Sequence, residues 1–493
     1  MKRIAFLIIA SLLVIGLVLP GCGDGGGEPE DVIYTFTDGK IKVAIAGPMD
    51  YIQGEHMWQG AELANGEIGT VDIDGVTHTI QLIQVETKEI AQPYSGYSAG
   101  QVENAITVQG ADFIIGGFRT EATAGMIEKA MQYKKMFFLN GAATGDLLKQ
   151  VNNNYAKYKY LFRATPINET FLFINNIMML GMVGPTIQSI LETPDTTDVK
   201  VAVVAEDLLW TETPIATVAA YVGPTGLNYT LTEVYKVSDT ADAINTELND
   251  IKSDGVHIVF TILSGPVGVT YGKQMGELGV PAMTLGINVE SQDPSFWDAT
   301  AYGEGKHGAE SMITLGTWAP NIAQSGNLTT DFLTAYVDEY GEFPVYTAAS
   351  YDMLLGLVEA IEDTATYDAE AGVASVLADD LIAWFENPGN ARVITSGTAG
   401  YFTTAHQGLV DAGVPAFAHD LKYGPQWVTG LGVQWQDDGA GNGIMVGVWP
   451  NKDYDAANNA LNPFNTALGL DWTDFEHEGT EMFDIPTWMI GEW

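Results

Sequence analysis

The chain has 493 residues, 46% of them hydrophobic, enough for about two to four ordinary domains with real cores. Its 63 acidic and 21 basic residues give a formal net charge of −42, and such a field repels nucleic acid and anionic membrane surfaces, so neither is expected as a partner. The single cysteine excludes an intrachain disulfide framework and a thiolate metal cluster.

The N-terminus has the pattern of a secretory signal peptide. Two basic residues open it, and residues 4–19 are almost wholly apolar, a run that is short for a membrane span. The following LPGC, residues 19–22, resembles the lipobox of prokaryotic lipoproteins. That likeness implies that Cys22 becomes the lipidated first residue, although Pro20 stands where a small residue is usual. The alternative is that the segment is retained as an N-terminal anchor.

An alternating α/β pattern begins at residue 41. The apolar, β-branched run of residues 41–46 predicts a buried parallel strand, a polar loop follows, and an amphipathic helix begins near Met57. Further strands are expected at residues 79–86, 111–117 and 135–140, with helices at 98–108 and 120–133. This alternation predicts a parallel sheet covered by helices on both faces. Ligands of such sheets bind where strands end and helices begin.

The pattern restarts after an extended crossover at residues 160–166. Strands are expected at residues 199–205, 231–235, 256–263 and 282–287, with helices at 169–182, 213–221, 241–253 and 267–278. A helical pair follows at residues 329–341 and 347–364, and residues 432–450 have the pattern of a hairpin around a glycine-rich turn. Two successive α/β units of similar layout predict a two-lobed α/β protein.

The segments IKVAIAGPMD, ADFIIGG, YLFRATP, VAVVAED, EYGEFPVYTAASYD and VQWQDDG…GVWP occur in this order. Together they resemble the branched-chain amino acid and amide type of ABC-transporter substrate-binding protein, the leucine-binding-protein family. The resemblance implies the type I periplasmic binding protein fold, in which two Rossmann-like parallel-sheet lobes, joined by three crossovers, enclose the ligand. The chain then divides into a signal peptide (1–22), a flexible acidic tether (23–37), lobe 1 (38–165 plus about 318–425), lobe 2 (166–317 plus about 426–450) and a C-terminal extension (451–493).

By this likeness, three loops of the first lobe would face the ligand. Their residues are Tyr51 and Gln53, then Phe118, Arg119 and Thr120, then Ala142, Ala143 and Thr144. Helix N-termini and free main-chain N–H groups could bind a carboxylate there. The family often has a small polar residue near the position of Arg119. The guanidinium of Arg119 could donate two parallel hydrogen bonds to a ligand carboxylate. The alternative is that Arg119 turns to solvent or pairs with Glu121. Arg163 matches the crossover arginine of the family and is expected to be structural.

The second lobe would contribute Trp210, Ser264, Gly265, Asn288 and Glu290. Trp210 suits a cleft wall and the core equally well. Glu290 or Asp207 could receive an ammonium group, although in so acidic a chain a solvated carboxylate is the more common case. Tyr351 and Asp352, in the later helix motif, are expected to serve packing and capping.

No phosphate loop, HExxH or GxSxG motif occurs, and the seven histidines lack metal-ligand spacing. We therefore expect no metal, no cofactor and no catalytic residue. The resemblance and the N-terminal pattern together imply a monomeric receptor outside the cytoplasmic membrane, on its outer face or in the periplasm, attached to it only through lipid at Cys22. It would close on a small polar solute, an amino acid first and an amide or aromatic carboxylate next, and pass it to an ABC permease and its ATPase. The open alternatives are a ligand sensor of the same fold and an extracytoplasmic hydrolase.

Overall fold

A six-stranded sheet forms the first lobe. The computed structural model describes residues 31–94, 96–224, 226–303, 305–405, 417–451, 477–486, 489 and 492–493. In spatial order the strands are β3 (Val71–Ile73), β4 (Val76–Glu86), β2 (Lys40–Gly47), β5 (Phe113–Gly116), β6 (Met136–Leu139) and β7 (Leu161–Arg163). Neighbouring strands pair in parallel except for β3 and β4. The strand predicted first, β2, lies inside this sheet because its apolar run can be buried on both faces.

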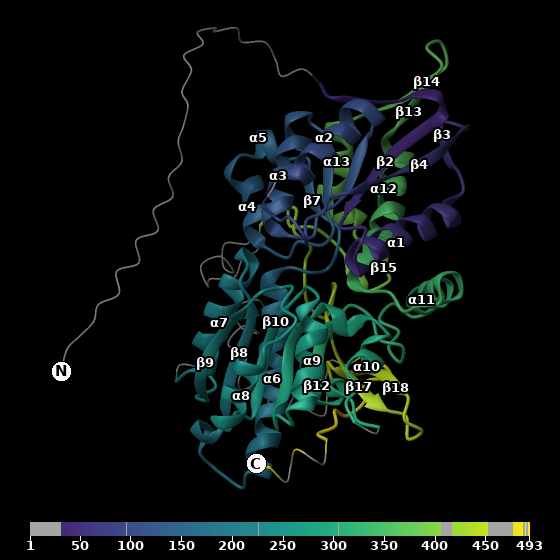
Figure 1. Ribbon diagram of the computed structural model, residues 1–493. Coiled ribbons are helices and arrows are strands. Elements are labelled where there is room, and N and C mark those ends of the chain that lie inside the picture. The colour runs from purple at the N-terminus through teal and green to yellow at the C-terminus, as the bar shows by residue number, and fades with distance from the viewer. Residues whose placement is uncertain are drawn as a thin grey trace, which may run out of the picture.

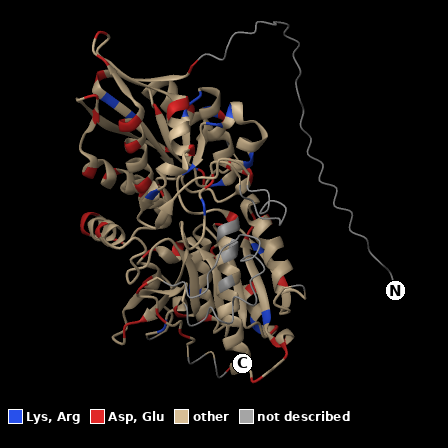
Figure 2. Cartoon of the chain, turned by 180° about the vertical axis from the view of Figure 1, so that it is seen from behind, with Lys and Arg blue, Asp and Glu red and all other residues tan. Residues whose placement is uncertain are grey.

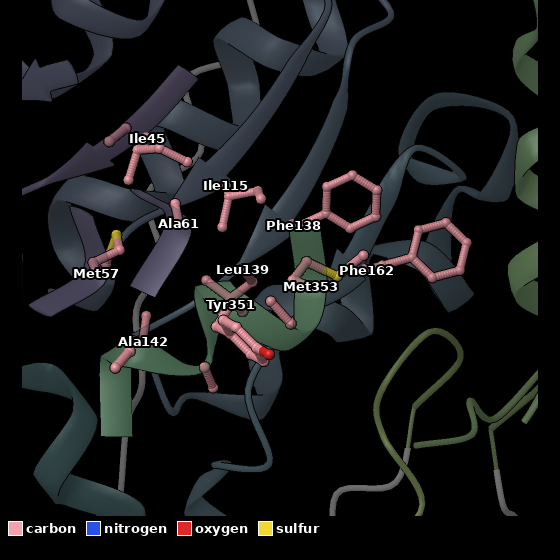
Figure 3. Packing of buried hydrophobic residues seen from close by; sticks show 14 of the residues in the cluster. Ile45, Met57, Ala61, Ile115, Phe138, Leu139, Ala142, Phe162, Tyr351 and Met353 are labelled. Atoms are coloured by element: carbon pink, nitrogen blue, oxygen red, sulfur yellow. The ribbon is translucent and has the colours of Figure 1, made fainter. Parts of the chain in front are cut away.

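Helices from two distant parts of the chain cover this sheet. They are α1 (Ile52–Ile68), α2 (Tyr97–Asn104), α3 (Thr120–Gln132), α4 (Gly145–Asn153), α5 (Tyr155–Tyr158), α11 (Asn327–Tyr340), α12 (Ser350–Thr364) and α13 (Ala378–Glu386). Figure 3 shows Met57 of α1 and Tyr351 of α12 in one apolar cluster with Ile45 and Phe138 of the sheet. The packing role predicted for Tyr351 is therefore confirmed, and the late helical pair completes the first lobe.

The second lobe holds a seven-stranded sheet. In spatial order its strands are β18 (Gly443–Trp449), β17 (Leu431–Asp437), β12 (Met312–Gly316), β11 (Met283–Asn288), β10 (Ile258–Leu263), β8 (Lys200–Glu206) and β9 (Thr230–Val237). The hairpin β17–β18 is antiparallel, and β17 pairs antiparallel with β12, while the other neighbours are parallel. The helices are α6 (Glu169–Ile190), α7 (Glu212–Val222), α8 (Asn245–Ser253), α9 (Val267–Glu277) and the short α10 (Phe296–Ala299).

The chain passes between the sheets after β7, after β12 and before β17, which is the expected two-lobed architecture (Figure 1). The described part of the C-terminal extension packs on the second lobe. The backbone N–H of Asp484 donates to the side chain of Gln434 in β17 (2.8 Å), and that of Glu481 donates to the carbonyl of Gly447 in β18 (2.9 Å). The Trp493 ring lies edge-on to His257.

Several elements differ from the sequence expectation, among them the inner strand β12, which was not expected. The short strand β1 (Ile33–Phe36) lies inside the segment expected to be a tether, and it pairs with β14 (Val373–Leu377). Helix α6 continues through Pro185 to Ile190, because Val183 and Ile187 are fully buried and packing outweighs the lost hydrogen bond. Helix α2 ends early and passes into a π-helical turn.

Two smaller sheets complete the first lobe. One contains β1, β14 and β13 (Thr366–Asp368), and the other contains β15 (Arg392–Ile394) and β16 (Gly397–Ala399). Acidic residues outnumber basic ones over both lobes (Figure 2). Among the described helices, none is long and apolar enough to cross a membrane.

Candidate functional site

A small cavity of about 20 Å³ lies between the two lobes. Loops at the strand ends of both lobes line it, together with the first crossover and the start of α6, which is where a ligand of such sheets is expected. Most of the lining side chains are apolar. The lining residues are Phe118, Arg119, Gly141, Ala143, Ile167, Leu172, Trp210, Ser264, Ile287, Val289 and Tyr346.

The first lobe supplies a wall of small and aromatic residues. Phe118 follows β5, and Gly141 and Ala143 follow β6. A Cβ atom on Gly141 would lie 2.7 Å from the carbonyl oxygen of Gly117, so only glycine lets the two loops approach this closely. The Tyr346 hydroxyl donates to the carbonyl of Gly141 (3.0 Å), which fixes the ring of Tyr346 beside the cavity.

The second lobe supplies the opposite wall. Trp210 follows β8, with 6% of its surface exposed, and its indole N–H donates to the Glu206 carboxylate over 3.3 Å. Ile287 and Val289 flank the end of β11. The bodies of these side chains leave an apolar space, and the polar groups lie at its edge.

Arg119 spans the gap between the lobes. It precedes α3 in the first lobe, and its guanidinium is almost fully buried. One terminal nitrogen lies 3.1 Å from the carboxylate of Glu206 and also donates to the hydroxyl of Ser264. The other donates to Asp239, 2.9 Å away. All three partners belong to the strand ends of the second lobe, so Arg119 joins the lobes directly.

A second polar bridge lies beside the first. The side-chain nitrogen of Gln53, in α1, donates to Glu290 (3.0 Å) and to the carbonyl of Ser264 (3.2 Å), both in the second lobe. Two acceptors for one NH₂ group fix the amide orientation. The side-chain oxygen of Gln53 is buried and has no hydrogen-bond partner among the described residues. It is therefore an unsatisfied acceptor on a side chain that contacts Ser264, a residue of the cavity lining.

The N-terminus of α3 is occupied by a carboxylate of the chain itself. Glu89 is fully buried, and one of its oxygens accepts the backbone N–H groups of Phe118 (2.8 Å) and Arg119 (2.7 Å). Its other oxygen accepts from the hydroxyl of Thr87 (2.8 Å). These two main-chain donors already have an acceptor.

Two further helix N-termini are occupied in the same way. Glu206 accepts the backbone N–H groups of Ser264 (2.8 Å) and Gly265 (2.6 Å), just before α9. Glu169 accepts the backbone N–H of Gly145 (3.2 Å), the first residue of α4. We refer to Glu89, Glu169 and Glu206 as the internal glutamates.

Burial changes the acidity of several of these groups. Loss of hydration raises the pKa values of Glu89, Glu169 and Glu290 to about 7. Hydrogen bonds from Phe118 to Glu89 and from Gln53 to Glu290 oppose the increase in pKa without cancelling it. The cleft therefore contains carboxyl groups that change charge near neutral pH.

The structure brings eight of the predicted site residues to the cleft. Phe118, Arg119, Ala143, Trp210 and Ser264 line the cavity, and Gln53, Gly265 and Glu290 take part in the polar contacts beside it. Arg119 pairs with Glu206 and Asp239 rather than with Glu121 or solvent.

The other five predicted site residues lie outside the cavity lining. The hydroxyls of Thr120 and Thr144 bond each other (2.5 Å), and the Asn288 side chain donates to the carbonyl of Gly268 (3.1 Å). Tyr51 packs against the apolar cluster that contains Phe118 and Trp210. The carbonyl of Ala142 accepts from the guanidinium of Arg163 (2.8 Å).

The structural role expected for Arg163 is confirmed, whereas Asp352 is buried but caps no helix, because its carboxylate binds Thr395 at the end of β15. Arg163 is fully buried and pairs with Asp420 (2.6 Å). The carboxylate of Asp352 accepts the backbone N–H of Thr395 (3.0 Å) and its hydroxyl (2.6 Å). The expected lipidation site, Cys22, lies outside the described residues.

Sequence reasoning missed several residues of the site. Ile287, Val289 and Tyr346 line the cavity, and the first two flank a predicted strand end, a signal that could have found them. Glu206 directly follows a predicted strand, whereas Glu89 has no local pattern that marks it. No group of three or more His, Cys, Asp or Glu residues suited to a metal ion occurs in the described part of the chain.

Comparison with known proteins agrees with this architecture. Residues 42–410 match the family described as periplasmic binding protein. The Leu/Ile/Val-binding protein homolog 7 of Brucella abortus is 22% identical over 419 residues, covering 83% of this chain and 90% of that protein.

Solved structures share the fold at low sequence identity. The branched-chain amino acid substrate-binding protein LivJ of Streptococcus pneumoniae, in complex with isoleucine, has a TM-score of 0.59 at 14% identity, covering 83% of this chain and 99% of LivJ. A Rhodopseudomonas palustris solute-binding protein in complex with 3,4-dihydroxybenzoic acid has a TM-score of 0.60 at 17% identity, with coverages of 83% and 97%. The family match spans well over half of the sequence and agrees with the two-lobed fold, so the chain belongs to the periplasmic binding protein family.

Proposed function

We propose that this chain is the solute-binding receptor of an ABC importer and that its lobes close on one small solute. The observation that carries the proposal is the apolar cavity between the lobes, with polar contacts from both lobes at its edge. Members of this family bind solutes without transforming them, so no bond-making step is assigned to the cleft.

A hinge motion would couple binding to transport. The cavity walls come from different lobes, so a solute contacts all of them only when the lobes are together, and binding then shifts the population towards that state. Gln53 and Arg119 reach across the gap, and Leu209 of the second lobe donates its backbone N–H to Glu121 of the first (2.9 Å). A permease could then recognise the closed arrangement of the two lobes.

The solute is small and has an apolar body. The resemblance alone favours an amino acid, with small amides and aromatic carboxylates next. LivJ with isoleucine and the Rhodopseudomonas palustris protein with 3,4-dihydroxybenzoic acid are two-lobed relatives that hold compact ligands. The apolar lining of Phe118, Trp210, Ile287 and Val289 suits the bodies of such ligands.

The protein acts outside the cytoplasmic membrane, held there by lipid on Cys22. The apolar N-terminal run and the LPGC sequence support this part of the proposal. A Cys22→Ser variant would leave the membrane fraction, and wild-type-like retention of that variant in the membrane would contradict the lipid anchor.

A binding screen tests the receptor function. Purified protein is mixed with amino acids, small amides and aromatic acids, and its melting temperature is measured. A ligand that prefers the folded protein raises the melting temperature. Small-angle scattering of the protein with and without the hit should show a smaller radius of gyration with ligand. A panel in which no solute changes either quantity would contradict the proposal.

A further inference from the structure

The internal glutamates occupy main-chain donors in three loops of the cleft. In α/β clefts a bound anion sits on the backbone N–H groups at helix N-termini. Here the donors that precede α3 and α9 and the one that opens α4 already donate to Glu89, Glu206 and Glu169. A ligand carboxylate that used these donors would have to displace a buried carboxylate of the chain or approach it at close range.

The guanidinium of Arg119 is engaged as well. Among the described residues, Arg119 is the only lysine or arginine in the cavity lining. Its two terminal nitrogens face Glu206, Asp239 and Ser264. Two carboxylates against one guanidinium leave this group of charges negative, before Glu290 is added. A second anion would therefore meet repulsion in a poorly hydrated site.

An unsatisfied acceptor on Gln53, whose amide contacts the cavity-lining Ser264, points to the opposite kind of head group. The side-chain oxygen of Gln53 is buried without a described partner, and its amide orientation is fixed by Ser264 and Glu290. A buried acceptor without a donor is costly, and a ligand N–H would remove that cost. The Nε atom of Arg119 is an unpartnered donor among the described residues, which a carboxamide oxygen could satisfy without adding charge.

We propose that the cleft takes an apolar solute whose polar end donates N–H hydrogen bonds, a primary amine or a carboxamide, and that it discriminates against the matching carboxylate. This inference rests on the proposed receptor function and specifies the ligand class of the same site. It departs from the sequence expectation that helix N-termini and Arg119 would take a ligand carboxylate.

Isothermal titration with matched head groups tests the inference on the wild-type protein. The probes are 3-methylbutylamine, 3-methylbutanamide and 3-methylbutanoate, then benzylamine, benzamide and benzoate, and finally leucinamide against leucine. Within each set the apolar body is constant, so differences report the head group. We expect the best amine or amide to bind at least tenfold more tightly than its carboxylate partner.

Raised salt serves as a control, because a chain with a net charge of −42 attracts any amine weakly at its surface. Binding in the cleft should persist at high salt, whereas surface attraction is screened. A carboxylate that binds as tightly as its amine and amide partners, or more tightly, overturns the inference and leaves the receptor function standing. Failure of every probe, together with failure of the wider solute screen, overturns both.

A variant provides an independent measurement. Glu89→Ala vacates the two N–H donors that precede α3, so the carboxylate probes should gain at least tenfold in affinity over wild type. Asp352→Asn is the matched control, because it also alters a buried carboxylate but lies away from the cleft, on Thr395. Equal carboxylate affinities in wild type and a folded Glu89→Ala protein would count against the inference. If the variant does not fold, the wild-type series decides.

Discussion

Arg119 in the first lobe lies 3.1 Å from Glu206 in the second, and both side chains are almost fully buried. The carboxylate of Glu206 is in turn held by the backbone N–H groups of Ser264 and Gly265. An ion pair in this position exists only while the lobes are together. It therefore couples the charge of one side chain to the opening and closing of the cleft.

Replacing Arg119 by methionine should open the cleft. Removing one partner of a buried pair costs roughly 3–5 kcal/mol because the other charge is left unpaired. The lobes can relieve this cost by separating and hydrating Glu206. We therefore expect the ratio of open to closed molecules to rise by at least about 100-fold. Small-angle scattering without ligand would then give a larger radius of gyration.

Lys149→Met is the control for this experiment. Lys149 pairs with Asp146 on the surface of α4 (3.3 Å), and exposed pairs contribute roughly 0–1 kcal/mol. Its scattering curve should match that of wild type. Identical curves for Arg119→Met and wild type would show that the ion pair does not control closure.

The pKa of Glu89 makes stability depend on pH. Burial raises this pKa from the ordinary value of 4.5 to about 7, so the folded protein keeps a proton that the unfolded chain releases. The stability from this group is complete below pH 4.5 and is lost as pH rises through about 7. Between pH 4.5 and about 7, the free energy of unfolding falls by roughly 3 kcal/mol because of this group.

Glu89→Gln should remove that pH dependence. Glutamine is uncharged, and its carbonyl can still accept from Phe118 and Arg119. We expect the variant to match wild type near pH 5 and to exceed its stability by up to about 3 kcal/mol near pH 8 in urea unfolding. The exposed Glu370→Gln serves as the control and should show no such divergence. A Glu89→Gln difference that is the same at both pH values would contradict the assignment.

Local sequence patterns predicted the two-lobed α/β layout, and the family resemblance predicted how the lobes are joined. Residues 41–46 are apolar and β-branched, and they form β2 in the middle of a sheet because only such a run can be buried on both faces. The crossover arginine, Arg163, was also placed correctly, since its neighbours in the chain carry the family likeness. Short edge strands such as β1 were missed because their burial depends on a partner, β14, far along the chain.

The candidate site was only partly predictable, because many of its contacts join residues that are far apart in the sequence. Strand-end loops identified Phe118, Ala143 and Trp210, because those positions follow from the order of strands. The partners of Arg119 lie 87 and 120 residues away, and nothing local links them to it. Occupation of main-chain donors by the internal glutamates likewise becomes visible only when the loops are assembled in three dimensions.

Two glycines of α1 should respond oppositely to alanine. A Cβ atom on Gly60 would lie 2.2 Å from the carbonyl oxygen of Ala348, whereas a Cβ atom on Gly66 meets nothing within 4 Å. Gly60→Ala should therefore cost about 1–3 kcal/mol or more, because α1 must move away from the segment before α12. Gly66→Ala should gain up to about 0.5–1 kcal/mol from helix propensity.

Thermal or urea unfolding of both variants checks this prediction. Gly60→Ala should also weaken solute binding, because α1 carries Gln53 into the interlobe contact with Glu290. Equal stabilities of the two variants would mean that α1 does not pack against this segment as tightly as the structure shows.

Trp210 should contribute to affinity mainly through its apolar ring. The ring lines the cavity, while its N–H group makes a long hydrogen bond of 3.3 Å to Glu206. Trp210→Phe keeps most of the apolar surface and should change the affinity for the tightest-binding panel solute by less than about fivefold. Trp210→Ala removes the wall and should weaken binding by about 10–100-fold, the equivalent of roughly 1.4–2.7 kcal/mol of lost contact.

Titration calorimetry and tryptophan fluorescence measure these effects together. Trp384→Phe is the control, because Trp384 lies on α13 with its indole N–H on Asp363, away from the cleft. Wild type and Trp384→Phe should both show a ligand-dependent change in emission, and Trp210→Phe should lose most of it. If Trp210→Ala binds the solute as tightly as wild type, the solute does not occupy the space between Trp210 and Phe118, and the ligand site must be sought elsewhere.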